Sequence, residues 1–193
     1  MKLTVNEIFY SLQGEGGRAG EASIFIRLTK CNLACSFCDT DFANGEDMTL
    51  DKILTEIKQY PCKWIIWTGG EPTIQLKSEY LAFFREHGYK QAIETNGTRR
   101  LPDGLDYITC SPKQDYESIR TRIPVVDEIR MPIQVGDNVP DITVFPQADN
   151  YFLSPVFDGD KINQQNVDYC VEMIKKYPAW RLSLQIHKLI HIE

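Results

Sequence analysis

The chain has 193 residues, which is enough for one domain of ordinary size. Its 42% hydrophobic and 25% charged residues are typical of a folded globular protein. The formal net charge of −6 argues against a nonspecific nucleic-acid-binding protein, which would carry a basic face. No apolar run approaches the roughly 20 residues of a membrane span, and the N-terminus has no secretory pattern. We therefore expect one domain over residues 1–193, located in the cytoplasm, with no membrane and no nucleic acid as a direct partner.

The first half of the chain alternates predicted strands with predicted helices. Apolar, β-branched runs predict strands at 22–29, 63–68 and 90–95. Between them, apolar residues recur at helical spacing and predict helices over 48–61 and 78–88. The first helix has a threonine N-cap and ends at a proline, and the second is closed by a glycine.

The second half of the chain has fewer clear helices. Strands are predicted at 105–111, 125–133 and 150–156, and no clear helix separates them. A strong amphipathic pattern predicts a helix over 163–178. The last predicted strand is 180–187, WRLSLQIH.

This order of elements predicts an α/β fold. Strands that alternate with helices imply βα units and a parallel sheet. About six parallel strands with few helices favour a truncated, partial TIM-like βα barrel. In such barrels the functional residues lie in loops at the C-terminal ends of strands. The unusual motifs of this sequence all fall at those positions.

Three cysteines follow the first predicted strand with the spacing C-x3-C-x2-C. They are Cys31, Cys35 and Cys38 in KCNLACSFCDTDF. Three thiolates this close can bind one soft metal centre, but they cannot complete a four-thiolate site within the run. A 4Fe–4S cluster held by three cysteines would keep one iron open to a ligand from outside the protein.

A zinc site, a ferredoxin-type carrier and a chance cluster all fit the cysteine run less well. A zinc site usually pairs C-x2-C with a second C-x2-C or with H-x3-H, and a ferredoxin-type carrier needs four ligands. Cys62, Cys110 and Cys170 are scattered and show no such pairing. A chance cluster of core cysteines is disfavoured because the loop is rich in polar and small residues.

The segment TGGEP, residues 68–72, gives an independent signal after the strand 63–68. Two glycines allow the backbone to approach a ligand closely. Glu71 offers either its carboxylate or its neighbouring backbone groups to an ammonium. The motif is weak alone and strong beside a three-cysteine loop.

The cysteine run followed by a GGE motif resembles the radical S-adenosylmethionine (SAM) superfamily. Over nearly the whole chain, EIFYSLQGEGGRAG, FIRLTKCNLACSFCDTDF, TGGEPTIQ, ETNGT, SPK and RLSLQIHK resemble the 7-carboxy-7-deazaguanine synthase family. That family has a truncated radical SAM barrel with few helices, as the element pattern also indicates.

The resemblance implies a lyase that converts 6-carboxy-5,6,7,8-tetrahydropterin to 7-carboxy-7-deazaguanine with loss of ammonia, in queuosine and 7-deazapurine biosynthesis. In this family a 5′-deoxyadenosyl radical made from SAM abstracts hydrogen from C6 of the pterin. The hydrogen is later returned, so that SAM acts catalytically. The implied cofactors are a 4Fe–4S cluster, SAM and Mg²⁺. The implied partners are the small-molecule pterin, a reductant such as flavodoxin or ferredoxin, and a second copy in a homodimer.

The resemblance also implies roles for particular residues. The cluster ligands, which carry the radical chemistry, would be Cys31, Cys35 and Cys38. The residues that contact the pterin would be Leu12, Gln13, Gly14, Arg27, Thr68, Glu94, His187 and, through the terminal carboxylate, Glu193. The residues that contact SAM would be Phe37, Cys38, Asp39, Gly70, Glu71, Ser111, Pro112, Lys113, Phe152, Leu153, Ser154 and Pro155. Thr40 would bind Mg²⁺ through its hydroxyl, since hard cations prefer oxygen ligands.

Each of the polar residues also has a structural alternative. Arg27, in an apolar strand, needs an anion, and an internal ion pair with Glu15 or Glu94 is the alternative to a substrate carboxylate. Glu94 could instead cap the NGT turn, and Thr40 could bond its own loop backbone. His187 could be structural. The sequence departs from the family at position 154, where members often carry glutamine.

Two rival functions remain open. A glycyl-radical-activating enzyme has the same cysteine spacing but acts on a protein backbone, whereas Arg27 and the SLQGEG segment favour a small anionic substrate. A noncatalytic iron–sulfur or zinc module would give no purpose to the glycine-containing loops at several strand ends.

Overall fold

The computed structural model describes residues 1–36, 38, 42 and 44–192. The predictions for Phe37, Asp39, Thr40 and Glu193 therefore lie outside the described residues. The chain divides into two compact units. Unit 1 comprises residues 1–11, 22–95 and 99–108, and unit 2 comprises residues 12–21, 96–98 and 109–193.

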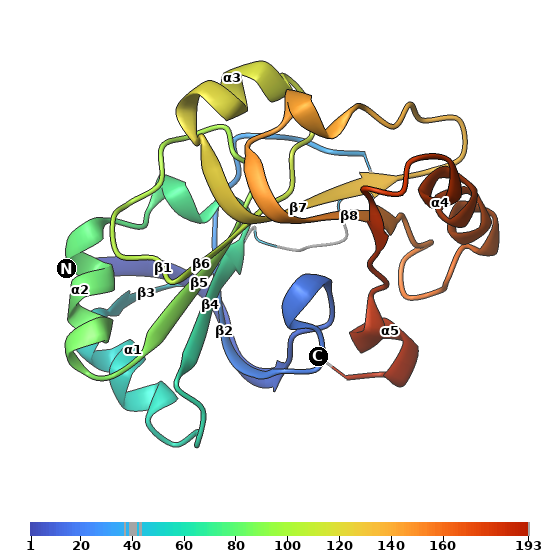
Figure 1. The fold of residues 1–193 in the computed structure, drawn as a ribbon. Coiled ribbons are helices and arrows are strands. Elements are labelled where there is room, and N and C mark those ends of the chain that lie inside the picture. Colours follow the sequence, from blue (N-terminus) through green and yellow to red (C-terminus); the bar gives the residue numbers. More distant parts are fainter. Residues whose placement is uncertain (37, 39–41, 43, 193) are drawn as a thin grey trace. The chain divides into compact units, whose positions relative to one another are not determined.

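Unit 1 is built on strands that run in the order β3-β1-β2-β4-β5 (Figure 1). Their bounds are Lys2–Leu12 for β1, Ala22–Leu28 for β2, Glu46–Thr49 for β3, Trp64–Gly69 for β4 and Lys90–Thr95 for β5. β1 pairs with β3 in antiparallel orientation, whereas β2, β4 and β5 are parallel. The parallel strands therefore direct their C-terminal ends to one edge of the sheet.

Two helices, α1 (Leu50–Ile57) and α2 (Ser78–Glu86), complete unit 1. Thr49 caps α1, because its hydroxyl accepts a hydrogen bond from the Lys52 amide at 3.2 Å. The apolar positions of α1 recur at helical spacing and are all buried in the core of the unit: Leu50, Ile53, Leu54 and Ile57. The same core contains Phe84 of α2 and Trp67 of β4, whose rings meet edge to face.

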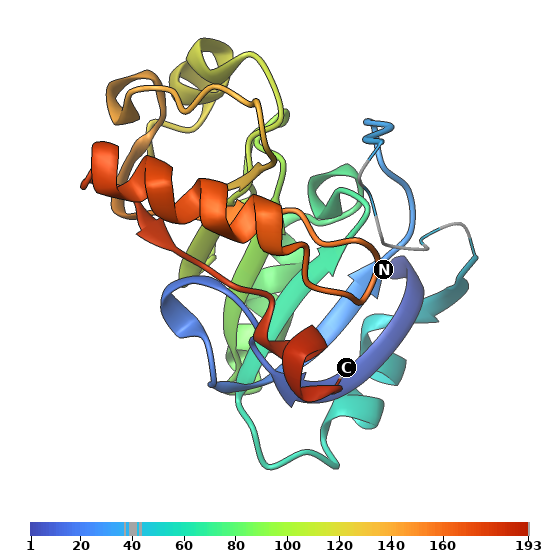
Figure 2. The same ribbon diagram turned by 90° about the vertical axis from the view of Figure 1, so that its right-hand side faces the viewer.

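Unit 2 carries a second run of parallel strands. These are β6 (Tyr107–Cys110), which begins in unit 1, and then β7 (Val125–Ile133), β8 (Gln147–Pro155) and β9 (Arg181–Leu182). Each pairs in parallel with the next. The helices of this unit are α3 (Tyr116–Arg122), α4 (Gln164–Lys176) and α5 (Ile186–Ile190). α4 contacts β8 and β9 (Figure 2).

Three short 3-10 turns complete the described elements, at Gly16–Arg18, Pro72–Ile74 and Ile142–Val144. No helix within the described ranges is long and apolar enough to cross a membrane.

The final predicted strand, over 180–187, is wrong for most of its length. Pairing with β8 ends at Leu182, and the Ser183 amide makes the last bond, to the Leu153 carbonyl at 3.0 Å. The chain then turns into α5, where the Ile186 amide donates to the Gly14 carbonyl at 2.9 Å. This backbone contact joins α5 to a loop that is distant in the sequence, which a local pattern cannot indicate.

Candidate active site

The three cysteines of the C-x3-C-x2-C run follow β2 directly. All are free thiols; Cys31 and Cys35 are half-buried and Cys38 is exposed. The Cys38 amide donates to the Cys35 carbonyl at 3.2 Å. The Cys31 sulfur accepts from the Leu33 amide at 3.4 Å. Among residues 1–36, 38, 42 and 44–192, no three His, Cys, Asp or Glu side chains are grouped closely enough to hold a metal ion.

The GGEP segment after β4 is joined to the start of the cysteine loop. The Gly70 amide donates to the Leu28 carbonyl at 3.1 Å, and the Glu71 amide donates to the Lys30 carbonyl at 2.8 Å. A Cβ atom at Gly70 would lie 2.1 Å from the Lys30 carbonyl oxygen and 2.9 Å from Cys31 Cβ. Only glycine therefore allows the two loops to approach this closely.

The side chain of Glu71 is committed to the protein. It is fully buried, and its Oε1 accepts hydrogen bonds from the Thr73 amide at 3.1 Å, the Thr73 hydroxyl at 2.6 Å and the Thr95 hydroxyl at 2.8 Å. These hydrogen bonds occupy the Glu71 carboxylate. We therefore expect the backbone groups beside Glu71, rather than its carboxylate, to contact a ligand.

Three of the predicted substrate residues lie in a row on neighbouring strands. Arg27 of β2 is aligned with Thr68 of β4. Trp67 is aligned with Ile93 of β5, so Glu94 comes level with Thr68. Aligned residues on parallel strands point to the same face of a sheet. The register therefore brings these side chains to one face at the C-terminal ends of three strands.

Arg27 is partly exposed and paired with Glu7, with 2.5 Å between Nε and Oε1. Its guanidinium also lies 5.8 Å from the centroid of the Phe9 ring, which stacks on Phe25. The internal ion pair considered from the sequence thus exists, but its partner is Glu7 rather than Glu15 or Glu94.

A second group of predicted residues lies in unit 2, around the loop at Leu12–Gly17. The Gly14 carbonyl accepts from the Ile186 amide, and a Cβ atom at Gly14 would lie 2.0 Å from His187 Nδ1. Gln13 is held from both sides, because its amide donates to the Glu21 carbonyl and its carbonyl accepts from the Gly20 amide, each at 2.8 Å. Gln13, Gly14 and His187 are therefore neighbours although they come from opposite ends of the sequence.

The remaining predicted SAM residues are also in unit 2. Lys113 Nζ donates to the Ser111 hydroxyl at 2.6 Å, just after β6. Phe152, Leu153, Ser154 and Pro155 form the end of β8 and are all buried. The predicted site residues thus fall into two groups, one in each unit.

Sequence reasoning missed a buried ionic cluster of Glu15, Glu128 and Arg130. The last two lie on β7, two residues apart and so on one face of the strand. Both are at most 5% exposed. The available signal was three charged residues, Asp127, Glu128 and Arg130, within the strand-like run VVDEIRMPI. Charged side chains are almost never buried unless they are paired.

Comparison with known proteins first defines the class of the chain. Residues 25–138 match the model of the Radical SAM superfamily, a range that contains the cysteine run and the GGEP segment. The chain is therefore a radical SAM enzyme, whose class implies a 4Fe–4S cluster and SAM as cofactors. Three thiols on one loop and a glycine that tolerates no side chain are compatible with such a centre.

The relatives define the family more narrowly. The chain is 42% identical over 192 residues to the 7-carboxy-7-deazaguanine synthase of Bacteroides thetaiotaomicron, covering 100% of both chains. It is also 42% identical over 201 residues to that of Haemophilus influenzae, covering 99% of this chain and 94% of the relative. The chain belongs to the 7-carboxy-7-deazaguanine synthase family of the radical SAM superfamily.

A solved structure supports the fold. The crystal structure of QueE from Escherichia coli matches with a TM-score of 0.75, covering 97% of this chain and 95% of that chain at 24% sequence identity. The predicted α/β fold, a partial radical SAM barrel with few helices, is confirmed by this match.

Proposed function

We propose that this enzyme converts 6-carboxy-5,6,7,8-tetrahydropterin to 7-carboxy-7-deazaguanine and ammonia. The observation that carries the proposal is the 42% identity, over the full length of both chains, to a 7-carboxy-7-deazaguanine synthase. The reaction rearranges one molecule and releases ammonia, so it balances without a net oxidant or reductant.

The residues proposed to hold the cofactors follow β2 and β4 in unit 1, and in unit 2 they follow β6 and form the end of β8. Cys31, Cys35 and Cys38 supply three soft donors, the set that suits a 4Fe–4S cluster with one open iron. When bound, the cluster and SAM would supply a carbon radical that removes a hydrogen atom from the substrate. The residues proposed to contact SAM are Phe37, Cys38, Asp39, Gly70, Glu71, Ser111, Pro112, Lys113, Phe152, Leu153, Ser154 and Pro155.

Substrate recognition would depend on charge and on hydrogen bonding. Arg27 offers a planar guanidinium to the substrate carboxylate, and the aligned positions of Thr68 and Glu94 support a shared role. A carboxylate at Glu94 suits the amino and ring N–H groups of the pterin. Leu12, Gln13, Gly14 and His187 would form further contacts, supported by the proximity of Gly14 and His187.

The finer features of the family are part of the same proposal. Thr40 would bind Mg²⁺ together with the substrate, and the terminal carboxylate of Glu193 would reach the pterin. A flavodoxin or ferredoxin would reduce the cluster. The enzyme would act as a cytoplasmic homodimer, in the route to queuosine or another 7-deazapurine.

Product formation tests the proposal. The enzyme, purified anaerobically and reconstituted with iron and sulfide, is incubated with SAM, Mg²⁺, a reductant and 6-carboxy-5,6,7,8-tetrahydropterin. We expect 7-carboxy-7-deazaguanine and ammonia in equal amounts, detected by mass spectrometry and an ammonia assay. Unchanged pterin with SAM cleaved against a polypeptide would favour a glycyl-radical-activating enzyme. Zinc in place of iron, with no charge-transfer absorbance, would favour a noncatalytic module.

A further inference from the structure

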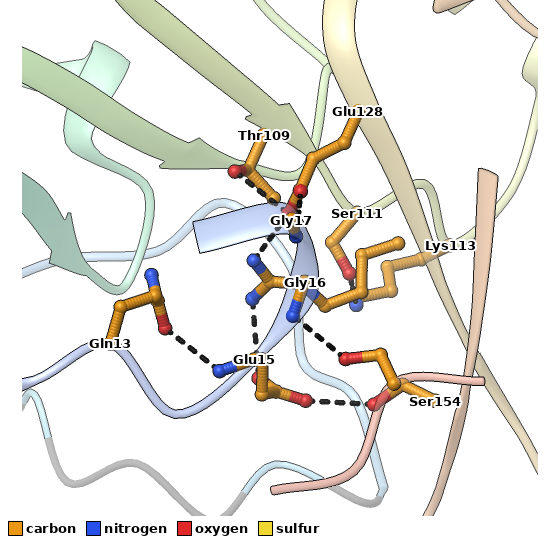
Figure 3. Close-up of polar contacts among 11 residues, drawn as sticks. Gln13, Glu15, Gly16, Gly17, Thr109, Ser111, Lys113, Glu128 and Ser154 are labelled. Carbon is orange, nitrogen blue, oxygen red and sulfur yellow. Dashed lines mark hydrogen bonds and ion pairs between the residues drawn. The ribbon is translucent and has the colours of Figure 1, made fainter. Parts of the chain in front are cut away.

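The carboxylate of Glu15, in the SLQGEG segment, is clamped from two sides within unit 2. Its Oε1 accepts a hydrogen bond from the Ser154 hydroxyl at 2.7 Å (Figure 3). Its Oε2 accepts a hydrogen bond from Arg130 Nη1 at 3.2 Å. Only 16% of the Glu15 side chain and 6% of the Arg130 side chain are exposed. Ionic hydrogen bonds with little exposure to water are weakly screened, so this clamp is stronger than a surface ion pair.

Arg130 also connects Glu15 to Glu128, a second carboxylate, which lies on β7. Arg130 Nη2 donates to Glu128 Oε1 at 2.5 Å, and the Thr109 hydroxyl donates to the same oxygen at 3.1 Å. The second oxygen of Glu128 accepts from the Gly17 amide at 2.7 Å (Figure 3). Arg130 thus pairs with one carboxylate from the loop and one from the sheet, and its single charge offsets one of their two negative charges. The hydrogen bonds from Ser154, Thr109 and Gly17 further stabilise the two carboxylates.

Consecutive residues of the loop are fixed by different elements. The Gly14 carbonyl is bonded by α5, Glu15 by β7 and β8, and the Gly16 amide by the Ser183 hydroxyl at 2.9 Å. Gly16 has a φ of +71°, and a Cβ atom there would lie 2.2 Å from Glu128 Oε1. These contacts restrain the loop at three consecutive residues, Gly14, Glu15 and Gly16.

We propose that Glu15 is a positioning residue for the substrate loop, Leu12–Gly14. The hydrogen-bonded carboxylate of Glu15 holds the backbone next to Gln13 and Gly14, so that the loop is ordered before the substrate binds. The free energy of substrate binding is then not reduced by the entropy cost of ordering the loop. The identity of the bound molecule rests on the function proposed above, whereas the ordering of the loop does not. Ser154 provides the contact from β8.

Hydrogen exchange tests the ordering directly and needs no catalytic turnover. We compare the reconstituted wild-type enzyme with Glu15→Gln, Glu15→Ala and Ser154→Ala, and use Glu79→Gln, an exposed carboxylate on α2, as the control. Glu15→Ala should raise exchange of the peptide covering residues 12–21 by roughly tenfold, the equivalent of one lost charge-assisted hydrogen bond. Glu15→Gln and Ser154→Ala should raise it less, because each keeps part of the clamp.

Kinetics then test the consequence for binding. Glu15→Ala should raise KM for the pterin by roughly tenfold, and Glu15→Gln should raise it less, while kcat at saturating substrate changes less than about threefold in both. SAM cleavage without the pterin should remain at the wild-type rate. Glu79→Gln should change nothing.

The outcomes separate the two proposals. If the wild-type enzyme does not turn over the pterin, the proposed function fails, and the exchange data alone decide whether Glu15 orders the loop. If exchange in residues 12–21 and KM are both unchanged in Glu15→Gln and Ser154→Ala, the positioning role is overturned. It is also overturned if Glu15→Ala raises exchange equally in all peptides and the two milder variants leave residues 12–21 unaffected.

Discussion

Arg27 and Glu7 form an ion pair on neighbouring strands of unit 1, with 2.5 Å between Nε and Oε1. The Arg27 side chain is 22% exposed and that of Glu7 is 49% exposed. A pair this accessible to water contributes only about 0–1 kcal/mol. In the proposed site, a substrate carboxylate would therefore displace Glu7 from Arg27 at little cost.

Replacement of Arg27 should weaken substrate binding selectively. Arg27→Gln removes a charge-assisted contact worth about 1.5–3 kcal/mol, so KM for the pterin should rise roughly 10- to 100-fold. Steady-state kinetics of the reconstituted enzyme would measure this rise.

Glu7→Gln is the matched control for Arg27, because it breaks the same ion pair from the other side. It should lower KM by less than about fivefold, since Glu7 no longer competes for the guanidinium. An unchanged KM in Arg27→Gln, or an equal rise of KM in both variants, would contradict the assignment of Arg27 to the substrate carboxylate.

Gly70→Ala should disturb the cysteine loop. The new methyl group would lie 2.1 Å from the Lys30 carbonyl oxygen, so the loop must shift, at a cost of roughly 1–3 kcal/mol. We expect a lower melting temperature and a lower iron content after reconstitution. Gly88→Ala is the control: Gly88 has a φ of +80° but no atom within 4 Å of a Cβ, so it should lower stability and leave iron binding intact.

Each cysteine of the run should be required for iron binding. Cys31→Ala, Cys35→Ala and Cys38→Ala should each reduce iron, sulfide and visible absorbance to background and abolish activity. Cys62→Ala provides the comparison, since Cys62 is a partly buried thiol whose Sγ donates to the Ala22 carbonyl at 3.0 Å. Full iron content in any of the first three variants would exclude that residue as a ligand.

The thiol of Cys170, on the buried face of α4, should lower the free energy of unfolding as the pH rises above about 9. Burial raises the pKa of the Cys170 thiol from its ordinary value of 9.0 to about 12. Below pH 9 the thiol is protonated in both states; above it, only the unfolded chain loses the proton, so the native state is progressively destabilised up to about pH 12. Urea unfolding at pH 8 and pH 10 should show a smaller loss of stability in Cys170→Ala than in the wild type. Equal losses would show that Cys170 keeps an ordinary pKa.

Much of the fold could be predicted from the sequence, because its signals are local. The strands at 90–95 and 125–133 were predicted with their exact bounds. The helices predicted over 48–61 and 78–88 exist but are shorter, at Leu50–Ile57 and Ser78–Glu86, and the N-cap of the first is Thr49 as predicted. N-caps, closing glycines and apolar periodicity act within a few residues. The row of Arg27, Thr68 and Glu94 was also accessible, since functional groups gather at the C-terminal ends of parallel strands.

The missed features depend on contacts between distant parts of the chain. β1 was not predicted, and α3 was missed because residues 116–122 carry more charge than apolar periodicity. α5 was not predicted, and the predicted strand 180–187 runs into its first two residues; the Ile186 amide at the start of α5 is bonded to the distant Gly14 carbonyl. The clamp on Glu15 joins residues 139 positions apart, at Ser154, which no local rule connects.

The ratio of product to 5′-deoxyadenosine tests the central claim most directly. The reconstituted enzyme is given limiting SAM and excess 6-carboxy-5,6,7,8-tetrahydropterin, and both products are quantified over time. We predict many molecules of 7-carboxy-7-deazaguanine for each molecule of 5′-deoxyadenosine, because in the proposed reaction the hydrogen removed from the substrate would be returned and SAM regenerated. One 5′-deoxyadenosine for each product molecule, or 5′-deoxyadenosine without any 7-carboxy-7-deazaguanine, would contradict the account.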